Sequence, residues 1–311
     1  MLRRAMILAA GLGLRMRPLS YYLPKPLLPV LNISLLEHQL RRLSACGIND
    51  AIINVHYLSS LIEQSVQERK GPGMRITLAR EFPLLLDTAG AVANAHRFFV
   101  DEEVFLVTNA DVLSGADLHA AYAHHLNSNA AVTMIVRDFP EGQGFEWIGV
   151  DAEGRVHRVP EMPGAPGLIR RLFIGTQIVS HRIFRYCNSS TPESIVRGSY
   201  RRMIEAGEHI GTYHDKTFWY EVGTPRQLFD ANFGLLSQDL TTTPPAIGRN
   251  VSVGRGTVIG PHSIIGDNVQ IGHDAKVDHS ILLSGARIES RKILENCIVV
   301  GNEILHIPNF D

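Results

Sequence analysis

The last quarter of the chain carries an aliphatic residue at every sixth position, and few folds accommodate such a repeat. Glycine follows each of the first five of these residues, and a second series of small or aliphatic residues lies four positions after them. A period of six over seven registers predicts a parallel β-helix, because each face needs an inward aliphatic side chain and glycine tolerates the tight corners. The length of the repeat disfavours the alternative, an irregular Gly/Val-rich sandwich. The aliphatic positions are Ile247, Val253, Ile259, Ile265, Ile271, Val277 and Leu283.

The repeat is expected to lose its period near residues 289–292, and residues 297–300 are expected to form a last strand or cap. Upstream, the run Thr-Thr-Thr-Pro-Pro at 241–245 reads as a linker. The sequence therefore predicts a domain over 1–240 and a repeat domain over 241–311.

Residues 1–240 alternate between short apolar runs and amphipathic stretches. Continuous apolar runs that end in glycine or polar residues are typical of strands buried on both faces, and strands alternating with helices predict a doubly wound α/β sheet. Between residues 142 and 212 the alternation is irregular, and a hairpin over 147–159 is expected within a region that covers the open edge of the sheet. Strands are predicted at 6–10, 51–55, 75–79, 104–108, 131–136 and 173–179, and helices at 34–46, 58–68, 89–98, 117–127, within 193–205 and at 225–237.

Composition excludes several classes of protein. The 311 residues are 45% hydrophobic with a formal net charge of −1, so a disordered chain is excluded and a general nucleic-acid or membrane-surface binder is disfavoured. Three widely spaced cysteines form no metal-binding pattern and fit a reducing compartment. No apolar run reaches the ~20 residues of a membrane helix, and the N-terminal run is too short for a signal peptide. A cytoplasmic protein with no nucleic-acid or membrane partner is expected.

A glycine loop follows the first predicted strand. Gly11 and Gly13 would let backbone N–H groups approach phosphate oxygens at the carboxyl end of a central strand. The loop is neither a P-loop, since no Gly-Lys-Ser/Thr follows, nor a dinucleotide fingerprint, since Met16 replaces the third glycine. It is followed instead by Arg15 and, ten residues later, Lys25 between two prolines. Two cations beside a glycine loop suit a triphosphate whose charge must be neutralised during transfer.

Five segments in order resemble the signature of the sugar-1-phosphate nucleotidyltransferases, or nucleotide-sugar pyrophosphorylases. The first two are the glycine loop and the run around Lys25, and the third, Leu-Asp-Thr-Ala-Gly at 86–90, resembles the family's Leu-Gly-Thr-Ala-Gly. Asn-Ala-Asp at 109–111 resembles its metal-binding Gly-Asp, and Trp-Tyr-Glu-Val-Gly-Thr-Pro at 219–225 resembles its Trp-x-Asp-Ile-Gly-Thr-Pro. The resemblance implies a Rossmann-like doubly wound mixed sheet of the nucleotide-diphospho-sugar transferase type, followed by a short left-handed parallel β-helix.

The same resemblance implies a reaction and a set of site residues. A nucleoside triphosphate and a sugar 1-phosphate would give a nucleotide sugar and pyrophosphate, with Mg²⁺ held by Asp111 and Glu221. Lys25 would hold the attacking phosphate or the α-phosphate, and Arg15 the β- and γ-phosphates. The remaining residues expected to bind substrate are Ala10, Gly11, Gly13, Thr88, Ala89, Gly90, Asn109, Gly149, Glu161 and Gly175.

The chain departs from the family pattern at two positions. Glu221 stands where the family has Asp, and Met162, after Glu161, stands where the family has a lysine that contacts the sugar phosphate. Losing a charged contact of about 1.5–3 kcal/mol would cost about 10–100-fold unless Arg158, Arg170 or Arg171 replaces it. A non-catalytic relative that binds nucleotide sugar therefore stays an alternative.

Other functions and features remain open. The short repeat domain makes the layout most similar to mannose-1-phosphate guanylyltransferases, with glucose-1-phosphate uridylyl- or thymidylyltransferase as the alternative. The open last coil is expected to mediate a homo-oligomer. Histidines in the repeat raise the hypothesis of acyl transfer. The resemblance implies three hexads per turn, so seven hexads are expected to make about two coils, and this small number disfavours acyl transfer. The neighbouring His124 and His125 are expected at the surface of a helix.

Overall fold

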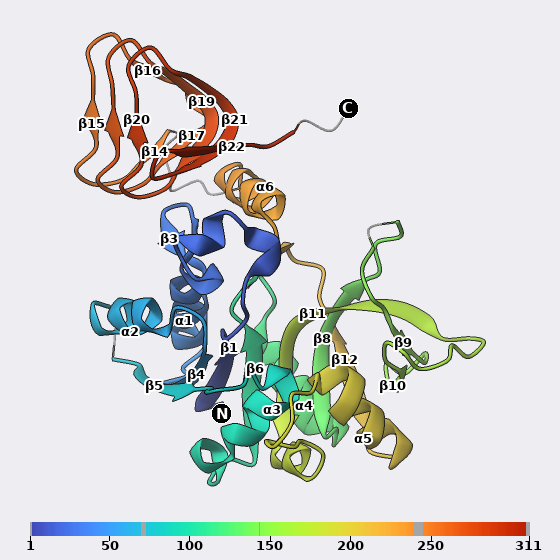
Figure 1. The fold of residues 1–311 in the computed structure, drawn as a ribbon. Helices are drawn as coiled ribbons and strands as arrows, with labels where there is room; N and C mark the ends of the chain where they lie inside the picture. Colours follow the sequence, from blue (N-terminus) through green and yellow to red (C-terminus); the bar gives the residue numbers. More distant parts are fainter. Residues whose placement is uncertain (1, 70–72, 143, 239–244, 309–311) are drawn as a thin grey trace. The chain divides into compact units, whose positions relative to one another are not determined.

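The computed structural model describes residues 2–69, 73–142, 144–238 and 245–308 (Figure 1). The chain divides into two compact units. The first unit comprises Met1–Leu12 and His38–Trp219, and the second comprises Gly13–Glu37 and Tyr220–Asp311. The glycine loop thus begins in the first unit and continues in the second.

A nine-stranded mixed sheet forms the centre of the first unit. Strands β1, β4, β5 and β6 run parallel in the order β6-β1-β4-β5, and β11 joins β6 in the antiparallel sense. β8 and β9 both pair with β11, and β12 and β10 extend those two branches. The α/β sheet expected from the alternating pattern is confirmed, and the sheet is mixed, as the family resemblance implies. The strands are β1 (Arg4–Leu8), β4 (Asp50–Val55), β5 (Arg75–Arg80), β6 (Val104–Asn109), β8 (Val132–Asp138), β9 (Ile148–Val150), β10 (Val156–Arg158), β11 (Ile169–Ser180) and β12 (Ile210–His214), with a short β7 (Val112–Ser114) outside the sheet.

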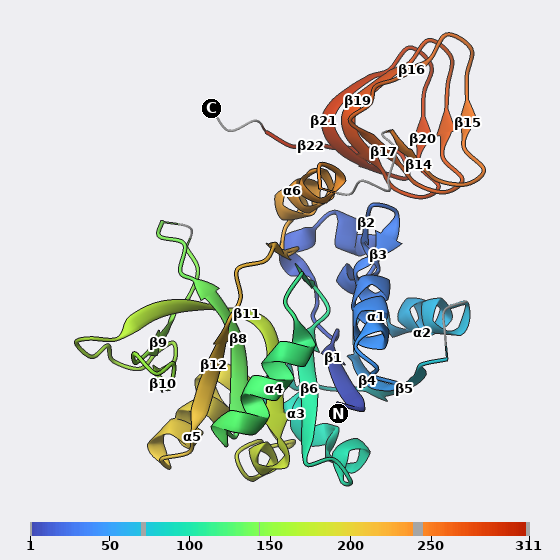
Figure 2. The same cartoon turned by 180° about the vertical axis from the view of Figure 1, so that it is seen from behind.

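Helices cover both faces of this sheet. Figure 1 shows α3 in front of the strands, and the reverse view in Figure 2 brings α4 forward. The predicted helix over 89–98 is interrupted at Ala95, and the one over 193–205 begins as a π-helix. No helix within the described ranges is both long and apolar enough to cross a membrane. The helices are α1 (Leu35–Ala45, shared between the units), α2 (Ser59–Gln67), α3 (Asp87–Asn94), η4 (His96–Phe99), α4 (Leu118–Ser128), η5 (His181–Arg185), η6 (Ile195–Tyr200) and α5 (Arg201–Glu205).

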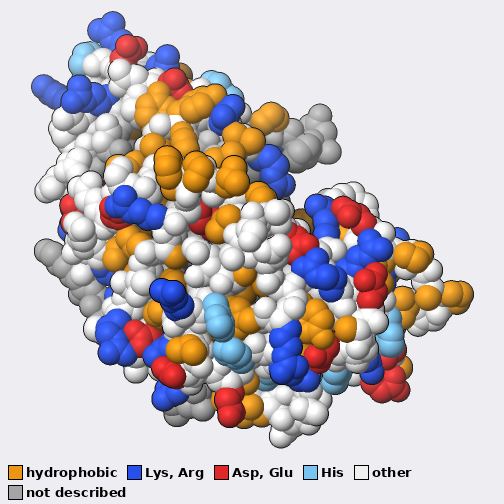
Figure 3. All heavy atoms as spheres, turned by 60° about the horizontal axis from the view of Figure 1, so that its bottom comes forward, with side chains coloured by type: hydrophobic (Ala, Val, Ile, Leu, Met, Phe, Trp, Pro, Cys, Tyr) orange, Lys and Arg blue, Asp and Glu red, His pale blue; other side chains and the backbone are white. Residues whose placement is uncertain are grey.

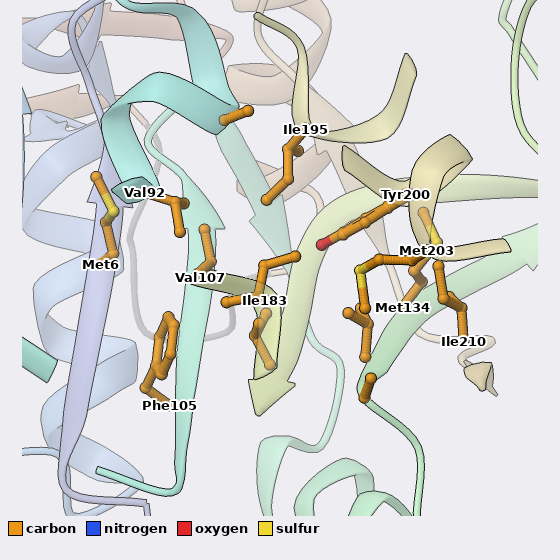
Figure 4. Close-up of a cluster of buried hydrophobic side chains, with 14 of the residues drawn as sticks. Met6, Val92, Phe105, Val107, Met134, Ile183, Ile195, Tyr200, Met203 and Ile210 are labelled. Carbon is orange, nitrogen blue, oxygen red and sulfur yellow. The ribbon is translucent and has the colours of Figure 1, made fainter. Parts of the chain in front are cut away.

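A cluster of buried apolar side chains packs the sheet against these helices (Figure 4). Met6 lies in it from β1 and Phe105 from β6, and the ring of Phe105 stacks on Phe99 at 4.0 Å between centroids. Tyr200 joins the cluster from η6 and is fully buried. Because continuous apolar runs face this core, the central strands are buried on both faces, as their sequence predicts.

His125 contradicts the expectation that both neighbouring histidines lie at the surface. Its side chain is 3% exposed, and Nδ1 lies 2.8 Å from the Thr133 hydroxyl of β8. Burial lowers the pKa of His125 to about 4. Neighbours in sequence point apart on a helix, so α4 turns His125 inward and leaves only His124 exposed.

The second unit joins residues 13–37 to α6 (Pro225–Leu236) and the repeat. The Ser34 hydroxyl accepts a hydrogen bond from the Glu37 N–H at 3.1 Å, so the expected cap of α1 is present. Residues 13–37 also form η1 (Leu14–Met16), η2 (Leu19–Tyr21), η3 (Lys25–Leu27), β2 (Pro29–Val30) and β3 (Ile33–Ser34), and β13 (Trp219–Glu221) lies at the boundary of the two units.

The C-terminal region is rich in short parallel strands and is consistent with a β-helix. Ile247 pairs with Ile265 one coil later, and Ile271 with Ile288, so similar side chains stack between coils. The last strand, β22, pairs antiparallel with β21 and caps the stack. The strands are β14 (Ala246–Ile247), β15 (Ser252–Val253), β16 (Val258–Ile259), β17 (Ser263–Ile265), β18 (Gln270–Ile271), β19 (Lys276–Leu282), β20 (Arg287–Ile288), β21 (Ile293–Val300) and β22 (Glu303–His306).

The stacking register differs from the sequence expectation at one point. Ile265 pairs with Leu282 and not with Leu283, so the coil shortens by one residue along β19. The aliphatic positions then continue at six-residue spacing through Ile288 and Leu294, past the point where the period was expected to break. His279 in the left-handed region at φ 43° marks the residue where the chain adjusts. The stack therefore holds more coils than the two that were predicted.

Candidate functional site at the carboxyl ends of the parallel strands

The site begins where β1 ends. The strand was expected to continue to Ala10, but it stops at Leu8 because the Ala9 N–H donates to the Asn54 Oδ1 atom at 2.7 Å and leaves the ladder. Ala9 and Ala10 are buried, so their backbone is fixed before Gly11. This arrangement places the start of the glycine loop at the carboxyl edge of the sheet, where open α/β sheets bind ligands.

Two buried polar residues that sequence reasoning missed hold this edge. Asn54 Nδ2 donates to Glu81 Oε1 at 2.8 Å, and the Leu86 N–H donates to Glu81 Oε2 at 2.7 Å. Asn54 and Glu81 are 5% and 3% exposed. A buried carboxylate is stable only when it is hydrogen-bonded, so this bridge links β1, the ends of β4 and β5, and the segment before α3. The only sequence signal was their position at the ends of two predicted strands.

The segment at the start of α3 is anchored on residues 193–195. The Thr88 hydroxyl accepts from the Ile195 N–H, and the Ala89 N–H donates to the Glu193 carbonyl, both at 2.8 Å. Gly90 is packed so closely that an added Cβ would lie 2.8 Å from the Leu86 side chain. Asp87 has φ 56°, in the left-handed region that glycine adopts without strain. The expected contacts of Thr88, Ala89 and Gly90 with base or sugar stay predictions.

Asp111 follows β6 beside the exit of β1. Leu8 and Asn109 are paired across the parallel strands, and the Ala110 N–H donates to the Leu8 carbonyl at 3.0 Å. The segments that follow β1 and β6 leave the sheet together here, so Ala10 and Gly11 lie next to the segment that carries Asp111. Gly175 is the close neighbour of Asn109, since a Cβ there would lie 2.8 Å from the Asn109 amide nitrogen.

Gly149 and Glu161 lie in the hairpin region of the first unit. A Cβ on Gly149 would lie 2.8 Å from a terminal methyl group of Leu168, so a larger residue there would displace the Leu168 side chain. Glu161 has φ 72°, and its carboxylate lies 3.3 Å from the Arg197 Nε atom. Arg197 also contacts Glu146, and these carboxylates raise the pKa of its guanidinium. Sequence reasoning did not single out Arg197.

Met162 packs half-buried against the core of the first unit, so its side chain has the environment of an apolar residue. The three arginines considered as replacements for the missing lysine all have partners. Arg158 donates to the Trp147 and Met162 carbonyls at 2.6 and 3.2 Å, and its guanidinium lies 3.6 Å from the Trp147 ring centroid. Arg170 pairs with Glu141 and Arg171 with Asp138.

The remaining site residues belong to the second unit. The Arg15 Nη2 atom lies 3.6 Å from Glu221 Oε1, and Arg15 is largely exposed. Gly13, at φ 62°, packs against the Lys25 segment, since a Cβ there would lie 3.6 Å from the Lys25 Cβ. Thr224 caps α6 with Pro225 in its first turn, which fixes the direction of the chain after Glu221. This unit therefore gathers both candidate cations and one of the two candidate metal ligands.

Comparisons with known proteins match both parts of the chain. The family model described as "Nucleotidyl transferase" matches residues 4–238, and the model "GMPPB C-terminal domain" matches residues 241–306. The mannose-1-phosphate guanylyltransferase catalytic subunit beta of Danio rerio is 30% identical over 95% of this chain and 85% of its own length. The mannose-1-phosphate guanylyltransferase of Mycobacterium tuberculosis is 29% identical over 71% of this chain, and the chain spans 61% of that relative.

A further relative and a solved structure are also similar to this chain. The UTP–glucose-1-phosphate uridylyltransferase of Synechocystis is 25% identical over 76% of this chain and 64% of its own length. The crystal structure of HddC from Yersinia pseudotuberculosis, complexed with GMP-PN, shares the fold with a TM-score of 0.62 at 19% identity, over 75% of this chain and 100% of that one. The chain belongs to the nucleotidyl transferase family, among the sugar-1-phosphate nucleotidyltransferases.

Proposed function

We propose that the chain transfers a nucleotidyl group from a nucleoside triphosphate to a sugar 1-phosphate, with GTP and mannose 1-phosphate as the substrates. The observation that carries this proposal is the joint exit of β1 and β6, which sets the start of the glycine loop, Ala10 and Gly11, beside the segment that carries Asp111. The match to a guanylyltransferase subunit across both parts of the chain supports the choice of substrates. The boundary between the domains lies near residue 240 in this proposal, as the sequence predicts.

In the proposed reaction, a phosphate oxygen of the sugar 1-phosphate attacks the α-phosphorus of the triphosphate. The bond from the α-phosphorus to the bridging oxygen breaks, and pyrophosphate leaves with that electron pair. The protein positions and neutralises both phosphates without a covalent intermediate. Lys25 holds the attacking or α-phosphate, and Arg15 holds the β- and γ-phosphates after leaving its pair with Glu221. The loop from Ala10 to Gly13 supplies N–H donors.

Nucleotidyltransferases of this family generally use a divalent metal. No group of three or more histidine, cysteine or acidic side chains with metal-binding geometry occurs among the described residues. Mg²⁺ takes one or two carboxylates and completes its shell with phosphate oxygens and water, so two acidic side chains are enough to hold it. We assign Asp111 and Glu221 as those carboxylates. When bound, the ion would neutralise charge on the phosphates and bring them together.

A pyrophosphate-release assay tests the proposal. The full chain is assayed with GTP, UTP, dTTP and ATP, each against mannose 1-phosphate and glucose 1-phosphate, with Mg²⁺ and with EDTA. Release that is fastest with GTP and mannose 1-phosphate and is lost in EDTA supports it. Fastest release with UTP or dTTP and glucose 1-phosphate replaces the substrates but keeps the reaction.

Met162 favours a second candidate, a relative that binds nucleotide sugar without catalysis. Its half-buried side chain offers no charge, and Arg158, Arg170 and Arg171 all have other partners. Absence of release with every pair, together with a rise in melting temperature on adding GDP-mannose, would establish this candidate. Release above the enzyme-free rate excludes it.

We further propose a cytoplasmic homo-oligomer formed through the repeat. Ile247 and Val253 of the first coil are 51% and 47% exposed, although their counterparts in the next coil, Ile265 and Ile271, are buried. A second copy of the chain would cover these side chains. Sedimentation of the full chain and of a chain ending at Ser237 tests this proposal, and a monomer in both would contradict it.

A further inference from the structure

A cavity of ≈ 420 Å³ opens at the opposite end of the sheet from the candidate catalytic edge. It lies beside η5, which begins directly after β11. Because β11 runs antiparallel to β6, Ser180 at its end pairs with Val104 at the start of β6. The cavity therefore lies at the amino end of the parallel strands. Its size is within the range of small-ligand pockets, and its lining residues are His96, His181, Arg182, Phe184 and Arg185.

Three rings form one wall of this cavity. The centroids of His96 and His181 are 5.3 Å apart, and Phe184 lies 4.5 Å from His96 and 4.9 Å from His181. The His181 Nε2 atom is buried, and none of the residues that the structure describes offers it a hydrogen-bond partner. Buried polar atoms are rarely unpaired in proteins, so this nitrogen points to a bound polar group.

The two arginines of the cavity differ in their partners. Arg182 Nη1 lies 3.0 Å from Glu208, and Nη2 and Nε donate to the Asn129 carbonyl and the Ser180 hydroxyl. Arg185 makes neither an ion pair nor a hydrogen bond within the described part of the chain. Burial, together with the charges of His96 and Arg185, lowers the pKa of His181. The cavity thus holds one uncompensated cation and two imidazole rings whose nitrogens can hydrogen-bond to an anion.

The face turned forward in Figure 3 shows histidine side chains gathered with Lys and Arg side chains around them. An arginine fork and imidazole N–H groups match the oxygens of a phosphate, and the aromatic wall can contact its apolar carrier. We propose that this cavity binds the phosphate group of a small phosphorylated metabolite, at a site separate from the candidate catalytic edge. The proposal does not depend on the reaction at that edge.

Titration calorimetry of the full chain tests the proposal with inorganic phosphate, mannose 1-phosphate and GTP as probes. Arg185→Gln removes the uncompensated cation at an exposed position, and Arg97→Gln is the matched control, an exposed arginine next to His96 that does not line the cavity. Losing a charged contact to phosphate is expected to weaken one binding event by about 10-fold or more in Arg185→Gln and to leave it within about 2-fold in Arg97→Gln.

The probe that loses most affinity in Arg185→Gln identifies the source of the phosphate. His181→Phe provides a second test, because it keeps an aromatic ring at this position and removes the ring nitrogens, and it is expected to weaken the same event. Pyrophosphate release without added effector is expected to stay at the wild-type rate in both variants. The proposal is overturned if each probe binds the wild type, Arg185→Gln and His181→Phe with the same affinity. This holds whatever the result of the catalytic assay.

Discussion

Buried polar side chains lie at strand ends in the first unit, whereas the coils of the second unit bury little besides apolar groups. Asn54 and Glu81 occupy the carboxyl edge of the sheet with a chain of hydrogen bonds. In the coils, over the described residues 245–308, the buried polar residues are Ser263 and Ser280. The difference indicates that apolar volume is enough to stack a repeat, while an edge that presents loops to a ligand needs specific hydrogen bonds.

The largest effect is expected from removing the negative charge of Asp111 at the carboxyl edge of the sheet in the first unit. Asp111→Asn keeps the shape of the side chain but weakens its hold on a cation, so kcat is expected to fall by about 100-fold or more. The thermal unfolding midpoint is expected to change little. Asp101→Asn is the matched control, since Asp101 is an exposed carboxylate of the same unit. Full activity of Asp111→Asn in the pyrophosphate-release assay would remove Asp111 from the site.

The apolar stack is tested by two isoleucines in the same stacking position. Ile265 is fully buried, and its partner one coil earlier, Ile247, is 51% exposed. Ile265→Ala is expected to lower the free energy of unfolding by about 2–4 kcal/mol, because it leaves a cavity in the stack. Ile247→Ala is expected to cost under about 1 kcal/mol in the isolated chain. Urea unfolding followed by circular dichroism measures both, and equal costs would contradict the stacked arrangement.

The sequence predicts the features of the fold that depend on neighbouring residues better than those that depend on contacts between distant elements. The central strands and the Ser34 cap were predicted because apolar runs and capping residues act on their immediate neighbours. The register step from Leu283 to Leu282 was missed because it follows from backbone geometry at His279, which the period alone does not encode. The inward turn of His125 was missed because its partner, Thr133, lies on another element.

The stability of the first unit is expected to depend on pH through the buried His125. Among the described residues of the coils, no histidine is buried to a comparable degree. The pKa of His125 is about 4 in the folded chain against 6.5 for an ordinary histidine. Between pH 6.5 and 4 the unfolded chain binds more protons, so stability falls as the pH is lowered through this window, by roughly 3 kcal/mol in total, and levels off below pH 4.

Replacing this histidine separates its effect from that of the carboxylates. His125→Gln is expected to flatten the fall in unfolding free energy between pH 6.5 and 4. His124→Gln, at the exposed neighbouring position, is expected to keep the wild-type slope. Urea titrations at half-unit pH intervals measure the three profiles. Parallel profiles for the wild type and His125→Gln would show that folding leaves the pKa of His125 unchanged.

For the candidate site, sequence reasoning named the residues that carry charge but not those that position them. Arg15 and Glu221 were named separately, and the structure brings them into contact. Arg197, the partner of Glu161, lies 36 positions away on a π-helix whose place against the hairpin region no local pattern shows. Asn54 and Glu81 were also missed, since buried hydrogen bonds between strand ends depend on the sheet order.

The positioning role of Glu81 gives the smallest and most specific effect. Glu81→Gln keeps one acceptor oxygen but turns an amide N–H₂ toward the donor of Asn54 or Leu86, so one hydrogen bond is lost and about 1–3 kcal/mol of unfolding free energy with it. Glu205→Gln, which breaks an exposed pair with Arg201, is expected to cost about 0.5 kcal/mol or less.

If Glu81 has only a structural role, Glu81→Gln lowers the free energy of unfolding and leaves the kinetics of the folded enzyme unchanged. If it positions the loops, KM for the triphosphate rises in Glu81→Gln by several-fold at temperatures well below unfolding, while KM for the sugar phosphate changes less. This asymmetry is expected because the bridge ends on Ala9 and Leu86, which flank the predicted triphosphate and base contacts. Unchanged KM values in a destabilised Glu81→Gln enzyme would assign the buried bridge to folding alone, and the contrast between the two units would then be one of packing and not of function.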